Sequence, residues 1–136
     1  MSCKPELYIA TTTETAVAAN GIVPFDITVR RRGMEIQRGG AGAVIADNGS
    51  NYYDVDVSVT FTAPVAGVVS LQLQQNNGDV VGATGSETIT TATTEVRTIT
   101  FPAVIRTFVS GAFDTLTLVN TGVAITISNA TMRIKK

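Results

Sequence analysis

The stretch from Val55 to Gln74 alternates apolar and polar residues, and this alternation is the feature that most constrains the fold. Valines and one phenylalanine occupy one parity of residues 55–62, and Asp, Ser and Thr occupy the other. After the segment 63–67 (APVAG), the alternation resumes as far as Gln74. Successive side chains of a β-strand point to opposite faces, so a period of two predicts a pair of half-buried strands.

Short patterns of the same kind recur along the whole chain, separated by Gly, Asn and Pro, and the run 75–79 (QNNGD) carries the Asn-Gly signal of a hairpin turn. No window holds a period of 3.6 residues for ten residues, so we expect no long helix. Many short strands with turn signals between them predict an all-β, antiparallel β-sandwich, a jelly roll of about nine to ten strands. Besides the pair at 52–74, the strands are expected at 7–10, 25–30, 43–46, 80–81, 87–91, 96–101, 104–109, 116–119, 123–128 and 132–135.

Charged residues are scarce, at 15% of the 136 residues against about 25% in typical soluble domains. The surface of a small monomer normally carries that charge, so we expect other chains to cover part of this one. The length fits one domain. We divide the chain into residues 1–20, an N-terminal arm or first strand, and residues 21–136, a single jelly-roll domain.

The chain lacks the residues on which most catalytic sites depend. It contains no histidine, which excludes Ser-His-Asp and Cys-His arrangements and histidine-containing zinc sites. The three lysines are Lys4, Lys135 and Lys136, so none is internal, and the single cysteine is Cys3. We therefore expect no enzymatic activity and no cofactor.

Two acidic features have a chemical interpretation and a plainer structural one. Asp54 and Asp56 share a strand face and could flank a scissile bond or a cation, but residues that keep a strand face soluble explain them equally well. The oxygen-rich run from Asp47 to Asp54 lacks the closing glutamate of a calcium loop, and an Asn-Gly hairpin turn accounts for it. We favour the structural interpretation of both and predict no metal site.

Arg30, Arg31 and Arg32 form the main charge cluster. The net charge of −1 gives no broad attraction to nucleic acid or to anionic membranes. The cluster could dock on an acidic partner surface or on packaged nucleic acid, or it could be solvated or paired with acidic residues of a neighbouring subunit. No aromatic residues lie between the arginines, which argues against nucleic acid.

Aromatic residues are few, and tryptophan is absent. Adjacent residues of a strand face opposite ways, so one ring of the Tyr52-Tyr53 pair must point outward, toward a sugar or a neighbouring subunit. The candidates for subunit contacts are Tyr8, Tyr52, Tyr53, Phe108, Phe113 and Leu116.

The chain shows no sign of secretion or of membrane insertion. The first seventeen residues have no apolar core of signal-peptide length, and no stretch approaches the roughly 20 apolar residues of a membrane span. From its opening methionine we expect a complete small gene product, made in the cytoplasm.

Four segments together resemble a known family layout. They are Gly21–Asp26 (GIVPFD), Phe61–Val69 (FTAPVAGVV), Asn77-Gly78 and Phe113–Leu118 (FDTLTL). This order resembles the jelly roll shared by tumour necrosis factor and the globular heads of complement and collagen-like proteins. The sequence departs from that pattern at Val68-Val69, where an aromatic residue is common, and in its basic rather than aromatic C-terminus.

The resemblance implies a homotrimer that buries one sheet around a three-fold axis. The small, Thr- and Gly-rich chain is also similar to jelly-roll proteins of bacteriophage virions, in which trimers decorate the capsid or form head fibres. The expected function is thus a structural protein of the virion, with major capsid or other virion proteins as partners and residues 1–20 as the contacting arm. The alternative is a receptor- or carbohydrate-binding head that uses the loops 47–53 and 75–79 at its distal end.

Overall fold

The chain forms eleven β-strands within the residues that the computed structural model describes, which are 4–46, 51–107 and 113–136. No helix occurs in these ranges. In chain order the strands are β1 (Glu6–Thr11), β2 (Thr15–Val17), β3 (Ile27–Arg32), β4 (Ile36–Gly39), β5 (Gly42–Ile45), β6 (Tyr52–Thr62), β7 (Gly67–Gln75), β8 (Gly78–Ile89), β9 (Arg97–Arg106), β10 (Asp114–Asn120) and β11 (Ile125–Lys135).

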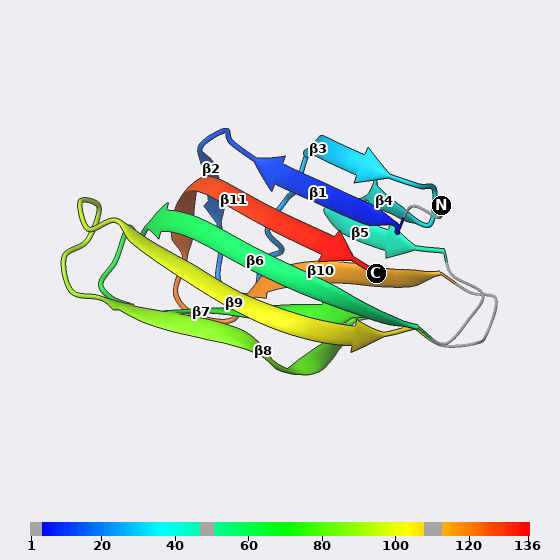
Figure 1. The fold of residues 1–136 in the computed structure, drawn as a ribbon. Coiled ribbons are helices and arrows are strands. Elements are labelled where there is room, and N and C mark those ends of the chain that lie inside the picture. Colours follow the sequence, from blue (N-terminus) through cyan, green and yellow to red (C-terminus); the bar gives the residue numbers. More distant parts are fainter. Residues whose placement is uncertain (1–3, 47–50, 108–112) are drawn as a thin grey trace.

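The strands build two antiparallel sheets packed face to face (Figure 1). Sheet I has the order β3-β1-β11-β6-β9, with β2 also paired to β11, and sheet II has the order β4-β5-β10-β7-β8. From β6 onward the chain moves from one sheet to the other, except at the β7–β8 hairpin. The alternating strands 52–62 and 67–75 therefore do not pair with each other, because the segment 63–67 crosses between the sheets. This is the predicted jelly-roll sandwich.

The core between the sheets consists of one parity of each long strand. In β6 the residues Val55, Val57, Val59 and Phe61 are buried, while their polar neighbours face outward. Sheet II contributes, among others, Val69, Leu71 and Leu73 of β7 and Leu116 and Leu118 of β10. Fully burying one such side chain contributes about 1.5–3 kcal/mol, so the alternation determines which face of each strand packs inward.

The hairpin between β7 and β8 has the turn that the sequence predicts. Asn76 and Asn77 have φ values of 53° and 67°, and Gln75 pairs with Gly78 across the turn. Two positive φ angles define the type I′ turn that matches the twist of paired strands, and Asn tolerates this conformation. The other predicted turn begins at residues 47–50, which lie outside the described residues.

Several boundaries differ from the sequence prediction: the expected strands 80–81 and 87–91 are one strand, β8, and β2 was not expected. The expected break at Pro102 is absent, because β9 is the edge strand of sheet I and a proline there removes no interior ladder hydrogen bond. The expected break near Asn129 is a register shift within the continuous strand β11. Strand β4 was not predicted, because Ile36 is its one fully buried apolar residue.

Both termini lie at the same end of the sandwich (Figure 1). The Lys136 amide donates to the Pro5 carbonyl at 3.1 Å. The β7–β8 turn is at this end too, since the Gln75 side chain donates to the Arg106 carbonyl, and Arg106 pairs with Tyr52. At the far end, the loop after β8 is tied to the β6–β7 turn by the Thr93 amide, which donates to the Ala63 carbonyl at 2.8 Å.

The first twenty residues contain two strands of sheet I. Strand β1 lies between β3 and β11, and its Leu7 and Ile9 are fully buried. Strand β2 pairs with the start of β11. Residues 6–11 and 15–17 are therefore strands of the sandwich and not a separate arm.

Candidate functional site

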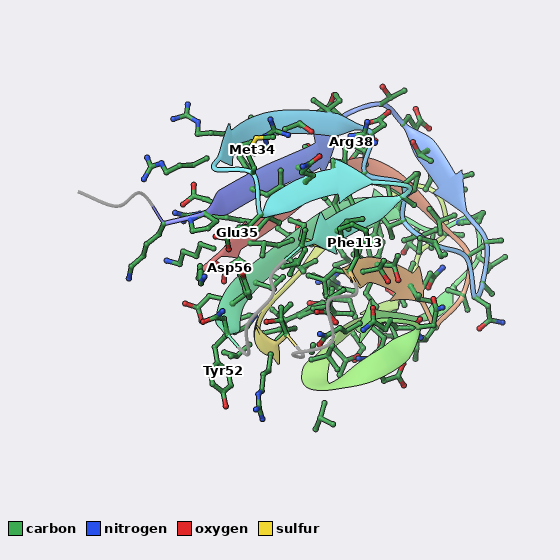
Figure 2. The ribbon with its side chains drawn as sticks, turned by 90° about the vertical axis from the view of Figure 1, so that its right-hand side faces the viewer. Met34, Glu35, Arg38, Tyr52, Asp56 and Phe113 are labelled. Carbon is green, nitrogen blue, oxygen red and sulfur yellow. The ribbon has the colours of Figure 1, made fainter. Side chains whose placement is uncertain are left out.

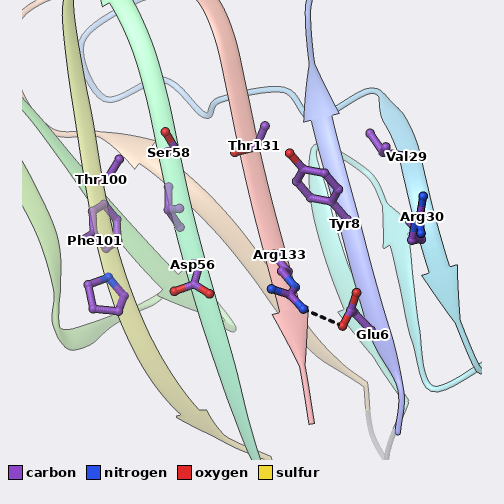
Figure 3. A pocket seen from close by; sticks show the side chains of 12 residues that line it. Glu6, Tyr8, Val29, Arg30, Asp56, Ser58, Thr100, Phe101, Thr131 and Arg133 are labelled. Atoms are coloured by element: carbon purple, nitrogen blue, oxygen red, sulfur yellow. Dashed lines mark hydrogen bonds and ion pairs between the residues drawn. The ribbon is translucent and has the colours of Figure 1, made fainter. Parts of the chain in front are cut away.

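The outer face of sheet I carries a hollow with a volume of about 830 Å³ (Figure 3). Strands β1, β3, β6, β9 and β11 all contribute to it. Its lining consists of Glu6, Tyr8, Val29, Arg30, Asp56, Val57, Ser58, Thr100, Phe101, Pro102, Thr131 and Arg133.

Strand register places the polar members of this lining in rows across the sheet. One row crosses all five strands and consists of Arg30, Tyr8, Arg133, Asp56 and Pro102. The next row toward the termini consists of Arg32, Glu6, Lys135, Asp54 and Val104. In each strand these residues have the parity opposite to the core, so the same alternation that builds the core builds this face.

A basic group and an acidic group pair in the middle of the face. The Arg133 guanidinium donates to the Glu6 carboxylate at 3.0 Å. This hydrogen bond holds the pKa of Glu6 below its usual range, and the positive charges of Arg133, Arg32 and Lys135 lower that pKa further. Arg133 lies between Tyr8 and Asp56 in the register but turns toward Glu6 (Figure 3).

Apolar and neutral side chains occupy the rest of the hollow. Tyr8 is half-buried, and Val29 is 52% exposed beside it. Toward the far end, the hydroxyl groups of Ser58, Thr100 and Thr131 line the surface. The lining thus combines two aromatic residues, Tyr8 and Phe101, with apolar side chains, hydroxyl groups and paired charges.

Several of the predicted site residues meet on this face. Tyr8 and Arg30 lie side by side in one row, and Arg32 is in the next. Arg31 pairs in register with the buried Leu7, so its side chain leaves β3 on the other side, where it donates to the Met34 sulfur. Tyr52 is 64% exposed and has the parity of Asp54 and Asp56, at the termini end of the same face.

Two of the predicted contact residues belong to the core instead. The side chains of Tyr53 and Leu116 are both fully buried, so neither is available for contact with another subunit. The Tyr53 hydroxyl donates to the Glu35 carboxylate at 3.1 Å, and the Lys136 ammonium also pairs with Glu35, at 3.3 Å. Phe108 lies outside the described residues.

Phe113 lies on the other side of the molecule. It is 66% exposed and lines a second hollow of about 310 Å³, on the outer face of strands β4 and β5 of sheet II. Glu35, Gln37, Arg38 and Val44 line the same hollow, and Figure 2 labels Glu35, Arg38 and Phe113. The predicted aromatic contacts therefore divide between two separate surfaces.

The described residues contain no group of three or more Cys, Asp and Glu side chains that could hold a metal ion. Asp54 and Asp56 are exposed on β6, next to each other on one face, as the sequence predicts.

Glu6 and Arg133, which line the hollow on sheet I, were not predicted as site residues. They meet because β1 and β11, at opposite ends of the chain, pair with each other. The available signal was the alternation of Arg133 and Lys135 with buried Met132 and Ile134, which puts the two basic residues on an outer face.

Comparisons with known proteins reveal relatives of fold alone. No protein-family model and no curated protein matches the sequence. Among solved structures, the PRD1 vertex protein P5 is similar with a TM-score of 0.64 and 20% identity over 100% of this chain and 99% of that one. The globular domain of zebrafish complement 1qA gives a TM-score of 0.66 at 10% identity, covering 96% and 94%. Murine APRIL gives 0.70 at 12% identity, covering 98% and 99%.

These similarities confirm the predicted family of folds. The chain has the jelly roll of the tumour necrosis factor and complement C1q type along nearly its whole length. In the described ranges no helix is long and apolar enough to cross a membrane.

Proposed function

We propose that this chain is a non-enzymatic structural protein of a bacteriophage virion, a capsid decoration or head-fibre component, and that it assembles as a homotrimer through the outer face of sheet I. The observation that carries the proposal is the hollow on that face. A soluble monomer seldom leaves a broad, partly apolar concavity open on one sheet, and a subunit contact would cover it.

The distribution of charge over the whole chain supports assembly. Charged residues make up only 15% of the sequence, yet seven of them lie in the two rows described on sheet I: Glu6, Arg30, Arg32, Asp54, Asp56, Arg133 and Lys135. A trimer contact on this face would leave the Thr- and Gln-rich face of sheet II in contact with water.

The common end of the two termini supports attachment there. Strand β1 begins at Glu6 beside the C-terminal Lys135, so all three copies would enter the trimer from the same end. We assign contact with the capsid shell to the chain before Glu6, which replaces the longer arm of residues 1–20. The structural similarity to the PRD1 vertex protein P5 over the full chain is in line with a virion role.

The virion role is tested by quantifying the protein in particles. We expect the chain in purified virions of the phage that encodes it, with a number of copies per particle that is a multiple of three. Quantitative mass spectrometry of gradient-purified particles measures the ratio of the chain to the major capsid protein, and the number of copies follows from that ratio. Absence of the chain from such particles would contradict a structural role in the virion.

The alternative function, a receptor- or carbohydrate-binding head, has one observation in its favour. The exposed ring of Phe113 lies beside Arg38 and Gln37 in the second hollow, an arrangement that could stack on a sugar and donate hydrogen bonds to it (Figure 2). The loops 51–53 and 75–79, which the sequence suggested for ligand binding, lie at the same end of the sandwich as the termini.

Binding to a glycan array distinguishes the alternative. Saturable binding that Phe113→Ala abolishes and Tyr52→Ala leaves unchanged would favour the carbohydrate-binding head. Tyr52 is the matched control because its ring is similarly exposed but lies on the face of sheet I.

A further inference from the structure

The outer face of sheet I has opposite charges at its two lateral edges. At the β3 edge lie Arg30 and Arg32, next to Tyr8 and Val29; we call these four residues the basic patch. At the β9 edge, Asp54 and Asp56 of β6 lie next to Val104 and Pro102 of β9; we call these four the acidic patch. Figure 3 shows Asp56 and Arg30 on opposite sides of the hollow.

Arg30, Arg32, Asp54 and Asp56 take no part in the ion pairs found among the described residues, although Lys135 lies opposite Asp54 and Arg133 lies opposite Asp56 in the register. Ion pairs among the described residues involve the acids Glu6, Glu35 and Glu95, and neither Asp54 nor Asp56. Strands β3 and β6 are three strand spacings apart, about 14 Å, which is too far for Arg30 to reach Asp56. Arg133 lies between them and is engaged with Glu6.

Each patch also has apolar surface that a partner would cover. Val29 in the basic patch is 52% exposed, and Val104 in the acidic patch is 59% exposed. Pro102 is exposed next to Val104 and donates no backbone hydrogen bond, so β9 presents a weak edge for strand pairing and a good surface for side-chain packing. Opposite charges surrounded by apolar contacts are the composition of a specific protein interface.

The chain itself supplies both halves of this complementary pair. Two different patches that complement each other give a head-to-tail contact between copies, and such a contact closes into a ring when the rotation between neighbours permits. The net charge of the chain is −1, so its overall charge does not favour binding of a polyanion over binding of a second copy of the chain.

We propose that in the trimer the acidic patch of each protomer packs against the basic patch of the next, with Asp54 and Asp56 paired to Arg30 and Arg32 of the neighbour. This inference rests on the proposed homotrimer and specifies its contact. Three identical head-to-tail contacts then pair the charges of the two patches and cover Val29 and Val104.

Charge reversal tests the pairing. Arg30→Glu with Arg32→Glu places like charges at every contact, and so does Asp54→Arg with Asp56→Arg. We expect each double variant to weaken trimer association at least 100-fold, measured by sedimentation equilibrium, and we expect all four changes in one chain to restore it. Arg31→Glu is the matched control, because it changes the same charge on the same strand but on the other side of the sheet. It should leave the trimer unchanged.

A mixture of the two double variants tests the head-to-tail geometry. In a ring of three, two kinds of subunit cannot alternate, so at least one contact keeps like charges, and the mixture should remain weaker than the fourfold variant. Full restoration by mixing would indicate a two-fold or even-numbered contact and overturn the proposal.

The outcomes separate this inference from the proposed function. A wild-type chain that is monomeric would contradict both the proposed homotrimer and the proposed contact. If the wild-type chain is a trimer and both double variants associate as strongly as Arg31→Glu, the proposed pairing is overturned and the proposed trimer stands. A fourfold variant that stays dissociated would have the same meaning. Circular dichroism of each variant checks its fold. If a variant is unfolded, the trimer of the wild-type chain is titrated with salt instead, and association that salt leaves unchanged would overturn the pairing.

Discussion

The outer faces of the two sheets use their polar residues in different ways. On sheet II many of them bind their own sheet: the Gln72 amide donates to the carbonyls of Leu73 and Val80 at 2.8 and 2.9 Å, and the Thr84 hydroxyl donates to the Leu71 carbonyl at 2.8 Å. On sheet I, Arg30, Arg32, Asp54 and Asp56 take no part in the ion pairs found among the described residues, and a hollow lies between them. The proposed trimer uses this second face.

The largest effect of a single substitution is expected from a charge placed in the centre of the sheet I face. Tyr8→Lys should weaken trimer association about 100-fold, roughly 2.7 kcal/mol, because it buries an ammonium group between Arg30 and Arg133, its neighbours in the register, in place of a ring. Sedimentation equilibrium over a range of protein concentrations measures the change. The corresponding substitution on sheet II, Thr117→Lys, should leave association unaltered. Equal effects of the two changes would erase the distinction between the faces.

A smaller effect is expected from the self-contained face. Gln72→Ala removes the amide that holds the irregular part of the β7–β8 ladder at Val80, so it should lower the free energy of unfolding by about 1 kcal/mol. Urea denaturation of the trimer and of the dissociated Tyr8→Lys variant provides the measurement. The loss should be the same in both backgrounds. A loss found only in the trimer would place Gln72 at the subunit contact.

Salt should sharpen the contrast further. Raising the sodium chloride concentration from about 0.05 to about 0.5 M shortens the screening length several-fold and should weaken association modestly through the charged patches. The apolar contacts should keep a trimer present at high salt. Light scattering at fixed protein concentration follows the change. In the Arg30→Glu, Arg32→Glu variant salt should not weaken association, because it then screens repulsion between like charges.

The sequence predicted the self-contained features better than the assembly face. The alternation of residues 55–74 identified β6 and β7 because each has one buried face, and Asn76-Asn77-Gly78 identified a turn whose geometry is local. The prediction missed the continuity of β9 through Pro102, because edge position is a property of the whole sheet. The charge rows on sheet I depend on the pairing of Glu6 with Lys135, 129 residues apart, and no local pattern encodes that register.

The smallest effect is expected far from both faces, in the loop after β8. The Glu95 carboxylate accepts hydrogen bonds from the Thr91 and Thr90 amides and pairs with Arg97 at 2.6 Å, which lowers its pKa to about 2. Because this pKa is lowered in the folded state, its stabilisation is present above the unfolded value near 4.5 and is lost as the pH falls toward 2. Thermal unfolding of Glu95→Gln should therefore depend less on pH between 4.5 and 2 than that of the wild type, while assembly at neutral pH should be the same for both.

The central claim is that the wild-type chain assembles through sheet I into a closed ring of three. Sedimentation equilibrium of the wild-type protein at micromolar concentration tests it most directly. We predict a single species of three times 14.2 kDa, about 43 kDa, without larger species as the concentration rises. A species of 14.2 kDa that persists at micromolar concentration would contradict the claim and leave the hollow on sheet I without a partner.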